Sequence, residues 1–339
     1  MTFLEYQIEK IKNNSVVIVY PEGTDPSIIQ AASRIIGYDI ATPVLVGHEE
    51  KIRQTAEELH VDISGARIID PPNSEKLDAY AEEFSVISKY PLTTAKVLLK
   101  KPLYYSAMMV RTGDADCMAA GILTETAEVV AAYKLILGME EGIETPSCIS
   151  FVETLTYQNG EEENNNLIAM ADTAINAAPS SKELADIAIA SAHTVRHLLG
   201  WEPRVAMLSF STLGSSNHES ARKVAQAVQI ANEREPELLI DGEMQLDTAV
   251  SPDVAERKFT RESQVAGRAN ILVFPDLGAS NIGIKLLQRL AGMKSNGGIL
   301  QGFARPVIDL SRGATVDQVE RNSVCLITTA YGQKTEKGE

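Results

Sequence analysis

The chain has 339 residues, 44% of them hydrophobic, and its 31 Lys plus Arg against 46 Asp plus Glu give a formal net charge of −15. This charge excludes the broad basic face that nucleic acid or an anionic membrane requires, whereas a small phosphate ligand needs only a local basic pocket. Residues 1–15 carry no secretory signal pattern, no apolar run reaches the roughly 20 residues of a membrane span, and three widely spaced cysteines predict reduced thiols in a cytoplasmic protein.

The first half of the chain alternates short β-branched runs with longer helical patterns. The strands predicted there are residues 16–20, 42–47, 66–70 and 117–121. The helices predicted there are residues 26–36, 49–60, 74–89, 93–101, 103–112 and 124–138. Near-continuous apolar strands separated by helices are typical of a parallel sheet covered on both faces.

The second half repeats this alternation and adds a hairpin. The predicted strands are residues 148–156, 167–172, 204–210, 238–241, 270–274, 298–301 and 306–310. The predicted helices are residues 182–199, a helix ending near 233, and residues 253–258, 279–291 and 315–331. The polar segment 158–166, with three consecutive glutamates, is expected to be a solvated hairpin tip. Ser180 or Ser181 is the expected N-cap of helix 182–199, and Gly200 its C-terminal stop.

These elements predict an α/β protein of two doubly wound α/β/α lobes with a cleft between them. We expect a discontinuous first lobe, residues 1–147 plus 304–339, and a second lobe of residues 148–303. Ligands of such sheets bind at the carboxyl ends of the strands. Polar loops that follow strands are therefore the candidate sites.

The first candidate is the loop that begins at Ser209 and precedes the helix after strand 204–210. Its polar and flexible members are Ser209, Ser211, Thr212, Gly214, Ser215 and Ser216. Backbone N–H groups and hydroxyls in such a loop can bind an oxyanion or a phosphate. The alternative is a serine-rich helix cap without a ligand. His218, just after the loop, is expected to start the helix.

Two further loops carry candidate residues. Ser311 and Arg312 follow the strand that ends near Asp309. The planar guanidinium of Arg312 suits a phosphate or a developing oxyanion, and the alternative is a salt bridge to Asp309. In the segment 274–285, Asn281 either binds a ligand or caps the helix, and Lys285 is expected to face solvent.

No metal site is expected. Asp241 and Asp247 bound a carboxylate-rich segment whose spacing fits no calcium loop, so a structural role is favoured. His193 and His197 lie four residues apart on a helix without a third ligand in sight, which favours a surface or packing role. The chain also lacks the GxGxxG, GxxxxGK[ST], GxSxG and HExxH motifs.

Several long motifs, in order, resemble the phosphate acetyl/butyryl transferase family, the phosphotransacetylases. RVAMLSFSTLGSS at residues 204–216 is similar to the family's RVAMLSFSTKGSA, and DGEMQLDTA at 241–249 to DGELQFDAA. VAGRAN at 265–270, FPDLGASNIGIKLLQRL at 274–290 and ILQGFARPVIDLSRG at 299–313 also match, as do PEGTD at 21–25 and the segment 115–121. The resemblance covers essentially the whole chain and is closer to the ethanolamine-utilisation branch.

The resemblance implies a reversible reaction in which acetyl-CoA and phosphate give acetyl phosphate and CoA. Ser311 and Arg312 then stabilise negative charge, and Asp317 is the candidate base. The implied substrate-binding residues are Thr126, Ser211, Thr212, Gly214, Ser215 and Asn281. The resemblance implies a homodimer, with coenzyme A as a substrate and no other cofactor.

Four positions depart from the family pattern. The family's catalytic Asp, seven residues after the Ser of DLSRG, is Gln318 here, and Asp317 precedes it by one residue, which rotates a helical side chain by about 100°. An Arg of the family becomes Ala131, and the Lys of its serine-rich loop becomes Leu213. A further Arg aligns loosely with Ile87.

These departures leave three hypotheses. The first is an active phosphate acyltransferase. The second is a catalytically impaired paralogue that binds a phosphorylated small molecule or an active partner subunit. The third is a decarboxylating dehydrogenase, because isocitrate and isopropylmalate dehydrogenases share a related two-lobed architecture; it rests on fold analogy alone.

Overall fold

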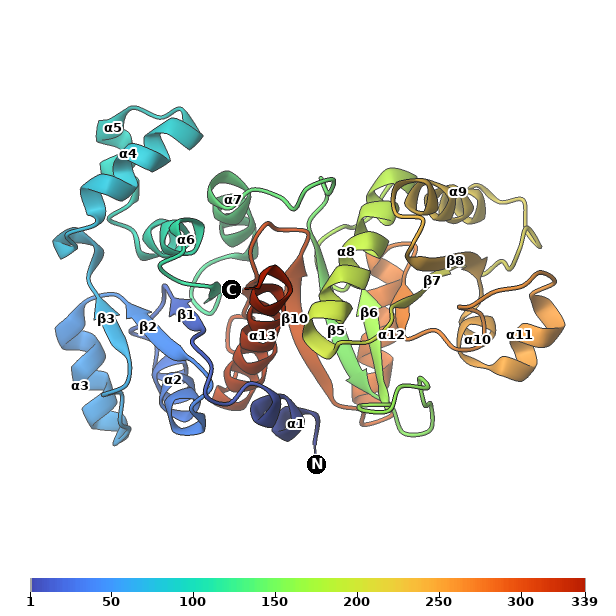
Figure 1. The fold of residues 1–339 in the computed structure, drawn as a ribbon, viewed down its shortest axis with the longest axis horizontal. Helices are drawn as coiled ribbons and strands as arrows, with labels where there is room; N and C mark the ends of the chain where they lie inside the picture. The colour runs from blue at the N-terminus through green and yellow to red at the C-terminus, as the bar shows by residue number, and fades with distance from the viewer. Residues whose placement is uncertain (1, 339) are drawn as a thin grey trace. The chain divides into compact units, whose positions relative to one another are not determined.

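The computed structural model describes residues 2–338 and divides into two compact units (Figure 1). Unit 1 comprises Met1–Glu141 and Phe303–Glu339, and unit 2 comprises Gly142–Gly302. The domain boundaries expected from the sequence, after residues 147 and 303, stay a prediction.

Unit 1 contains five strands, which are all parallel to their neighbours in the order β3-β2-β1-β4-β11. The strands are β1 (Val17–Tyr20), β2 (Thr42–Val46), β3 (Arg67–Ile69), β4 (Cys117–Ala120) and β11 (Val307–Asp309). The helices are α1 (Phe3–Lys10), α2 (Pro26–Tyr38), α3 (Glu49–Leu59), the 3-10 turn η1 (Pro71–Asn73), α4 (Leu77–Ser88), α5 (Leu92–Leu98), α6 (Pro102–Thr112), α7 (Thr126–Ile136) and α13 (Val316–Lys337).

Helices cover both faces of the unit 1 sheet. Helices α2 and α3 lie on one side of the strands, and α6 and α7 lie on the other (Figure 1). Every residue of β4 is buried, as a strand covered on two faces requires. The parallel arrangement places the end of β11 beside the end of β4, with Asp309 opposite Ala120.

Local sequence explains where the unit 1 helices begin. Helix α2 starts with Pro26 directly after Asp25, whose carboxylate accepts the N–H groups of Ser27 and Ile28. Helix α1 was not predicted, because its apolar pattern is weak. It starts with a capping box between Thr2 and Glu5, a signal that the sequence does contain.

Unit 2 contains six strands in the order β10-β5-β6-β9-β7-β8. The strands are β5 (Ser147–Glu153), β6 (Leu167–Ala171), β7 (Arg204–Leu208), β8 (Leu239–Met244), β9 (Ile271–Val273) and β10 (Ser295–Gln301). The helices are α8 (Ser181–Leu199), α9 (Glu219–Arg234), α10 (Leu246–Val250), α11 (Pro252–Lys258) and α12 (Leu277–Arg289). The predicted hairpin is β5–β6, β10 is antiparallel to β5, and the other pairs are parallel.

Two expectations for unit 2 can be checked directly. Ser180 caps α8 in a capping box with Glu183, and Gly200 ends the helix in the left-handed conformation, so both expected caps are confirmed. The solvated hairpin tip is wrong for Glu161. Its carboxylate lies 2.8 Å from Arg204, and both side chains are largely buried. Glu161 is drawn in by Arg204 of β7, whereas Glu162 and Glu163 are exposed as expected.

The fold is the predicted α/β class, with helices flanking mostly parallel strands in each unit. Among residues 2–338, no helix is both long enough and apolar enough to span a bilayer.

Candidate functional site

The turn after β11 presents Ser311 and Arg312 to solvent. Leu310, which precedes them, is buried, and its N–H bonds the carbonyl of Ala120 at 2.6 Å. Ser311 and Arg312 are both exposed, and Gly313 takes a positive φ of 82° before α13 begins. The sheet therefore fixes the start of the turn while the two polar side chains stay open to an anion.

Asp309, at the end of β11, joins this turn to the start of α7. The Thr126 hydroxyl donates to Asp309 Oδ2 at 2.6 Å, whereas Oδ1 is buried without a hydrogen-bond partner among the described residues. Burial raises the pKa of Asp309, the Thr126 hydrogen bond opposes that shift, and the negative charge of Glu22 reinforces it. Gly121 lies directly against Oδ1, where a Cβ atom would stand only 2.2 Å from the oxygen.

Glu22, from the PEGTD segment, holds the loop between β4 and α7. Its carboxylate is 7% exposed and accepts the backbone N–H groups of residues 121–124 at 2.8–3.0 Å. Four amides that could otherwise bind a phosphate are thus bound to a protein carboxylate. Sequence analysis identified this segment only as a family match and missed its structural role.

Arg312 has one close ionic partner, which is Glu125 at the N-cap of α7. Their nearest charged atoms are 3.7 Å apart, and the side chains are 67% and 75% exposed. An ion pair so exposed contributes little stability, about 0–1 kcal/mol. The expected alternative, a salt bridge from Arg312 to Asp309, is not formed. The guanidinium can therefore exchange Glu125 for an anionic ligand at small cost.

The structure places the candidate base Asp317 against another helix. Its carboxylate bonds Arg34 of α2 at 2.8 Å and is 74% exposed. Gln318 completes a capping box at the start of α13, where its Oε1 accepts the N–H of Thr315 at 2.9 Å. The residue at the family's base position thus closes a helix end, and the catalytic role of Asp317 stays a prediction.

The serine-rich loop of unit 2 connects β7 to α9. Ser211 is buried, and its hydroxyl donates to Glu243 Oε1 at 2.7 Å, which also accepts the N–H of Gly214 at 2.8 Å. The Ser215 hydroxyl accepts the N–H of Thr212 at 3.1 Å, and the Thr212 hydroxyl accepts the N–H of Gln245 at 3.0 Å. These bonds fix the loop from within and from the end of β8.

The expectation that this loop offers its backbone N–H groups to an anion is wrong for this structure. All six N–H groups of residues 211–216 donate to acceptors within unit 2. Ser215 and Gly214 are nevertheless exposed, and Ser216 is half-buried. Hydroxyl groups, rather than amides, are what the loop presents at its surface.

Asn281 lies in the second turn of α12, half-buried, and its side chain makes no hydrogen bond with the described residues. The capping alternative for Asn281 is excluded, because Asp276 caps this helix through the N–H of Ala279 at 2.8 Å. Its amide is therefore available to a ligand. Lys285 is exposed, as expected.

Two other predicted interpretations can be compared with the structure. Asp241 binds Arg261 and accepts the Ser263 hydroxyl at 2.6 Å, a structural role. His218 is the N-cap of α9, as expected, and its ring accepts the N–H of Ser220. Within residues 2–338, no three His, Cys, Asp or Glu side chains are arranged to hold a metal ion.

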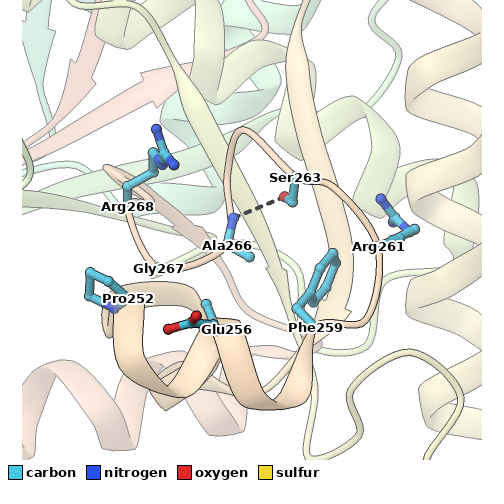
Figure 2. Close-up of a pocket in the computed structure, with 9 residues that line it drawn as sticks. Pro252, Glu256, Phe259, Arg261, Ser263, Ala266, Gly267 and Arg268 are labelled. Carbon is cyan, nitrogen blue, oxygen red and sulfur yellow. Dashed lines mark hydrogen bonds between the residues drawn. The ribbon is translucent and has the colours of Figure 1, made fainter.

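A surface pocket of about 330 Å³ lies between α11 and the loop that follows it (Figure 2). Phe259 forms an apolar wall, and Arg268 and Glu256 stand on the pocket's rim. None of the residues proposed from the sequence lines this pocket. Sequence reasoning matched part of its lining, residues 266–268, only as a family motif and assigned it no role.

Comparison with known proteins covers nearly the whole chain. The family model described as "Phosphate acetyl/butaryl transferase" matches residues 2–328. A phosphate acetyltransferase of Thermoanaerobacterium thermosaccharolyticum is 44% identical over 322 residues, which are 94% of this chain and 96% of the relative.

Two solved structures are similar throughout their length. The EutD phosphotransacetylase from Staphylococcus aureus has a TM-score of 0.87 and 35% identity, over 97% of this chain and 98% of that one. A phosphotransacetylase from Streptococcus pyogenes has a TM-score of 0.88 and 34% identity, over 98% and 100%. With the sequence motifs and both unit folds in agreement, the chain belongs to the phosphate acetyl/butaryl transferase family.

Proposed function

We propose that this protein is a phosphate acyltransferase that converts acetyl-CoA and phosphate reversibly into acetyl phosphate and CoA. The observation that carries the proposal is the turn after β11, where Ser311 and Arg312 are exposed on a backbone fixed by the sheet. Family membership over residues 2–328 supports it, as do relatives named phosphate acetyltransferase.

In the direction of CoA acylation, the thiol first loses its proton to a base. The thiolate then attacks the carbonyl carbon of acetyl phosphate, a sulfur–carbon bond forms, and the carbon–oxygen bond to phosphate breaks. The phosphate departs with the bonding electrons. Negative charge develops on the carbonyl oxygen and on the leaving group, so permanently charged donors lower the barrier.

We assign the charge-stabilising roles to Arg312 and Ser311. Arg312 offers five N–H donors, and its single weak contact with Glu125 leaves it able to bind an anion. The Ser311 hydroxyl makes no hydrogen bond within the described chain and can donate to the same charge. Thr126 is the first residue of α7, and its hydroxyl already donates its proton to Asp309. We therefore propose that Thr126 acts as a hydrogen-bond acceptor or as a positioning residue.

For unit 2 we propose that Ser215, Gly214 and Asn281 contact substrate. Ser215 and Gly214 are exposed, and the Asn281 amide is unpartnered among the described residues. Ser211 and Thr212 bond with groups inside unit 2, so we propose that they support the loop's shape instead of contacting substrate directly.

The decisive experiment measures phosphate-dependent release of CoA from acetyl-, propionyl- and butyryl-CoA. We expect Arg312→Ala to lower kcat by about a hundredfold to a thousandfold, the usual cost of losing one transition-state donor. Arg53→Ala is the matched control, because Arg53 is also exposed and paired with a glutamate, Glu49, on α3. No phosphate-dependent rate from folded protein would overturn the proposal and leave a binding role.

The base is tested separately. If Asp317 accepts the thiol proton, Asp317→Ala lowers kcat and alters the acid limb of the pH–rate profile. Arg34→Ala, which releases the Asp317 carboxylate, then changes the same limb while leaving the carboxylate present. A rate and profile unaffected by Asp317→Ala would remove this residue from the mechanism.

We further propose a cytoplasmic homodimer with no cofactor beyond its CoA substrate. Three buried cysteines that form no disulfide support a reducing compartment. Ile282 and Leu286 of α12 and its C-cap Leu290 are 61%, 50% and 81% exposed at intervals of four residues, an apolar stripe that supports association. Sedimentation equilibrium of the wild type and of Leu286→Glu tests the assembly; a wild-type monomer would contradict it.

A further inference from the structure

A second surface pocket in unit 2, of about 570 Å³, is bounded by residues of α8 and α9. The lining residues that matter are Ser181, His218, Glu219, Arg222, Lys223 and Gln226. None of them was proposed as a site residue from the sequence. Two are cationic and one is anionic, which is unusual on a chain with a formal net charge of −15.

Neither cation of this pocket is neutralised by an ion pair within the described residues. The Lys223 ammonium donates to the carbonyl of Pro275 at 2.9 Å, and the Arg222 guanidinium donates to the backbone and side-chain oxygens of Asn217. All these acceptors are uncharged. Since an ammonium has three N–H donors and a guanidinium five, both groups keep donors and full charge for a ligand.

The neutral groups of the pocket also present donors. His218 Nδ1 lies 3.2 Å from the backbone N of Ser220 and 2.9 Å from its hydroxyl, so Nε2 is the ring nitrogen left for a ligand. The Gln226 carbonyl oxygen accepts the Ser181 hydroxyl at 3.0 Å, which leaves the amide NH₂ group to donate. The residues that line this cavity thus include several side chains with N–H donors that the described residues leave unused.

Carboxylates near the pocket oppose this charge only in part. Glu219 lines the cavity. Glu183 lies close enough for Lys223 to help lower its pKa, but its carboxylate accepts the N–H of Ser180 at 2.7 Å as part of the α8 capping box. Lys182, on the same helix, is paired with Glu144 at 2.7 Å.

We propose that this pocket binds a phosphate group, held by Arg222 and Lys223 and oriented by His218 and Gln226. An anionic group rich in oxygen acceptors is what a donor-rich cationic cavity recognises. Two substrates of the proposed reaction carry that chemistry, the nucleotide end of CoA and free phosphate, so the identity of the ligand rests on the proposed function.

The test measures binding by isothermal titration calorimetry with two probes, 3′,5′-ADP and inorganic phosphate. The variant Arg222→Gln with Lys223→Gln removes both charges and keeps polar side chains of similar size. We expect its affinity for the bound probe to fall at least tenfold, and the wild-type affinity to weaken as salt rises. The control is Lys100→Gln with Lys101→Gln, two exposed lysines of unit 1 whose loss gives the same net charge.

Each outcome decides the proposal. Pocket-dependent binding of 3′,5′-ADP supports it and identifies the CoA nucleotide as the source, with a raised KM for CoA and a nearly unchanged kcat. Pocket-dependent binding of phosphate alone supports it and identifies the free ion. Binding of neither probe, or equal affinity in the double variant and the wild type with native circular dichroism, overturns it.

The same measurements separate this inference from the proposed function. If the wild type has no acyltransferase activity but binds the probe, and the double variant loses that binding, the phosphate site is supported and the proposed enzymatic function is refuted. If the wild type is an active acyltransferase and the substitutions change neither probe binding nor the KM for CoA, the proposed function is supported and the phosphate site is refuted.

Discussion

The two units each hold one strand-end loop with a buried glutamate, but the two glutamates bind different groups. The Glu22 carboxylate accepts four backbone N–H groups and no other donor among the described residues. Glu243 accepts one N–H group and the Ser211 hydroxyl, and the loop's other bonds run through hydroxyls. The first loop depends on one carboxylate, whereas the second depends on a network.

This difference shows where an anionic substrate can be bound. Amides that already donate to a protein carboxylate, or to a hydroxyl, are not open to phosphate. In both units the groups that we propose for ligand binding are accordingly side chains, such as Arg312 in unit 1 and Asn281 in unit 2. Backbone anion sites are thus used here to fix loop shape.

The largest effect is expected from Glu22→Gln, which breaks the first loop's sole support. The neutral amide removes the charge from four hydrogen bonds and turns an NH₂ group toward backbone donors, so we expect a loss of about 3 kcal/mol in the free energy of unfolding. Urea denaturation measures it. Glu128→Gln, an exposed carboxylate of α7, is the matched control and should change stability by less than about 0.5 kcal/mol. Equal stabilities would contradict the comparison.

Glu243→Gln should have a smaller effect of about 2 kcal/mol, because both donors reach Glu243 Oε1 and a Gln carbonyl oxygen, with two lone pairs, can accept from both after the charge is removed. Urea denaturation alongside Glu22→Gln ranks the two glutamates. A larger loss for Glu243→Gln would show that the hydroxyl network depends on this carboxylate more than the amide loop depends on Glu22.

Ser211→Ala sharpens the comparison at one group. The buried hydroxyl donates to Glu243 and accepts the N–H of Ser216 at 3.0 Å, so its loss should cost about 1–2 kcal/mol of stability. Ser220→Ala, which removes a hydroxyl at the surface of unit 2, provides the reference. Thermal unfolding of both variants checks the difference, and indistinguishable midpoints would refute a supporting role for Ser211.

The smallest effect concerns pH and Asp309. Because burial raises the folded-state pKa of Asp309, the native protein holds this proton more tightly than the unfolded chain does. The resulting stability is present below the unfolded pKa and is lost as pH rises through the folded pKa. Asp309→Asn lacks this loss, so its stability relative to wild type should improve on raising the pH from about 4 toward neutrality. A constant difference across that range would contradict the raised pKa.

Much of the fold could be predicted because its signals are local. Apolar runs located the strands, and Ser180 with Gly200 marked the ends of α8. Glu161 was misplaced because its partner, Arg204, lies 43 residues further along the chain, and sequence pattern does not reveal such a pair.

The candidate site was predictable to a similar extent. Motif matching found the exposed turn of Ser311 and Arg312. It could not show that the Glu243 carboxylate binds the N–H of Gly214 or that Arg34 binds Asp317, because each contact joins residues that are far apart in the sequence. The sequence identifies the candidate site residues, and tertiary contacts determine which of their polar groups are left to bind a ligand.

The return of the chain to unit 1 has a consequence for synthesis on the ribosome. Strand β11 pairs with β4, and Ser323 of α13 receives the buried Tyr20 hydroxyl's hydrogen bond, yet both segments are translated after all of unit 2. Until then β4 is an apolar edge strand of the nascent chain, and such an unpaired edge promotes aggregation. Ser311 and Arg312 also emerge only after unit 2, so a chain that terminates before them lacks both the β11–β4 pairing and the proposed chemistry.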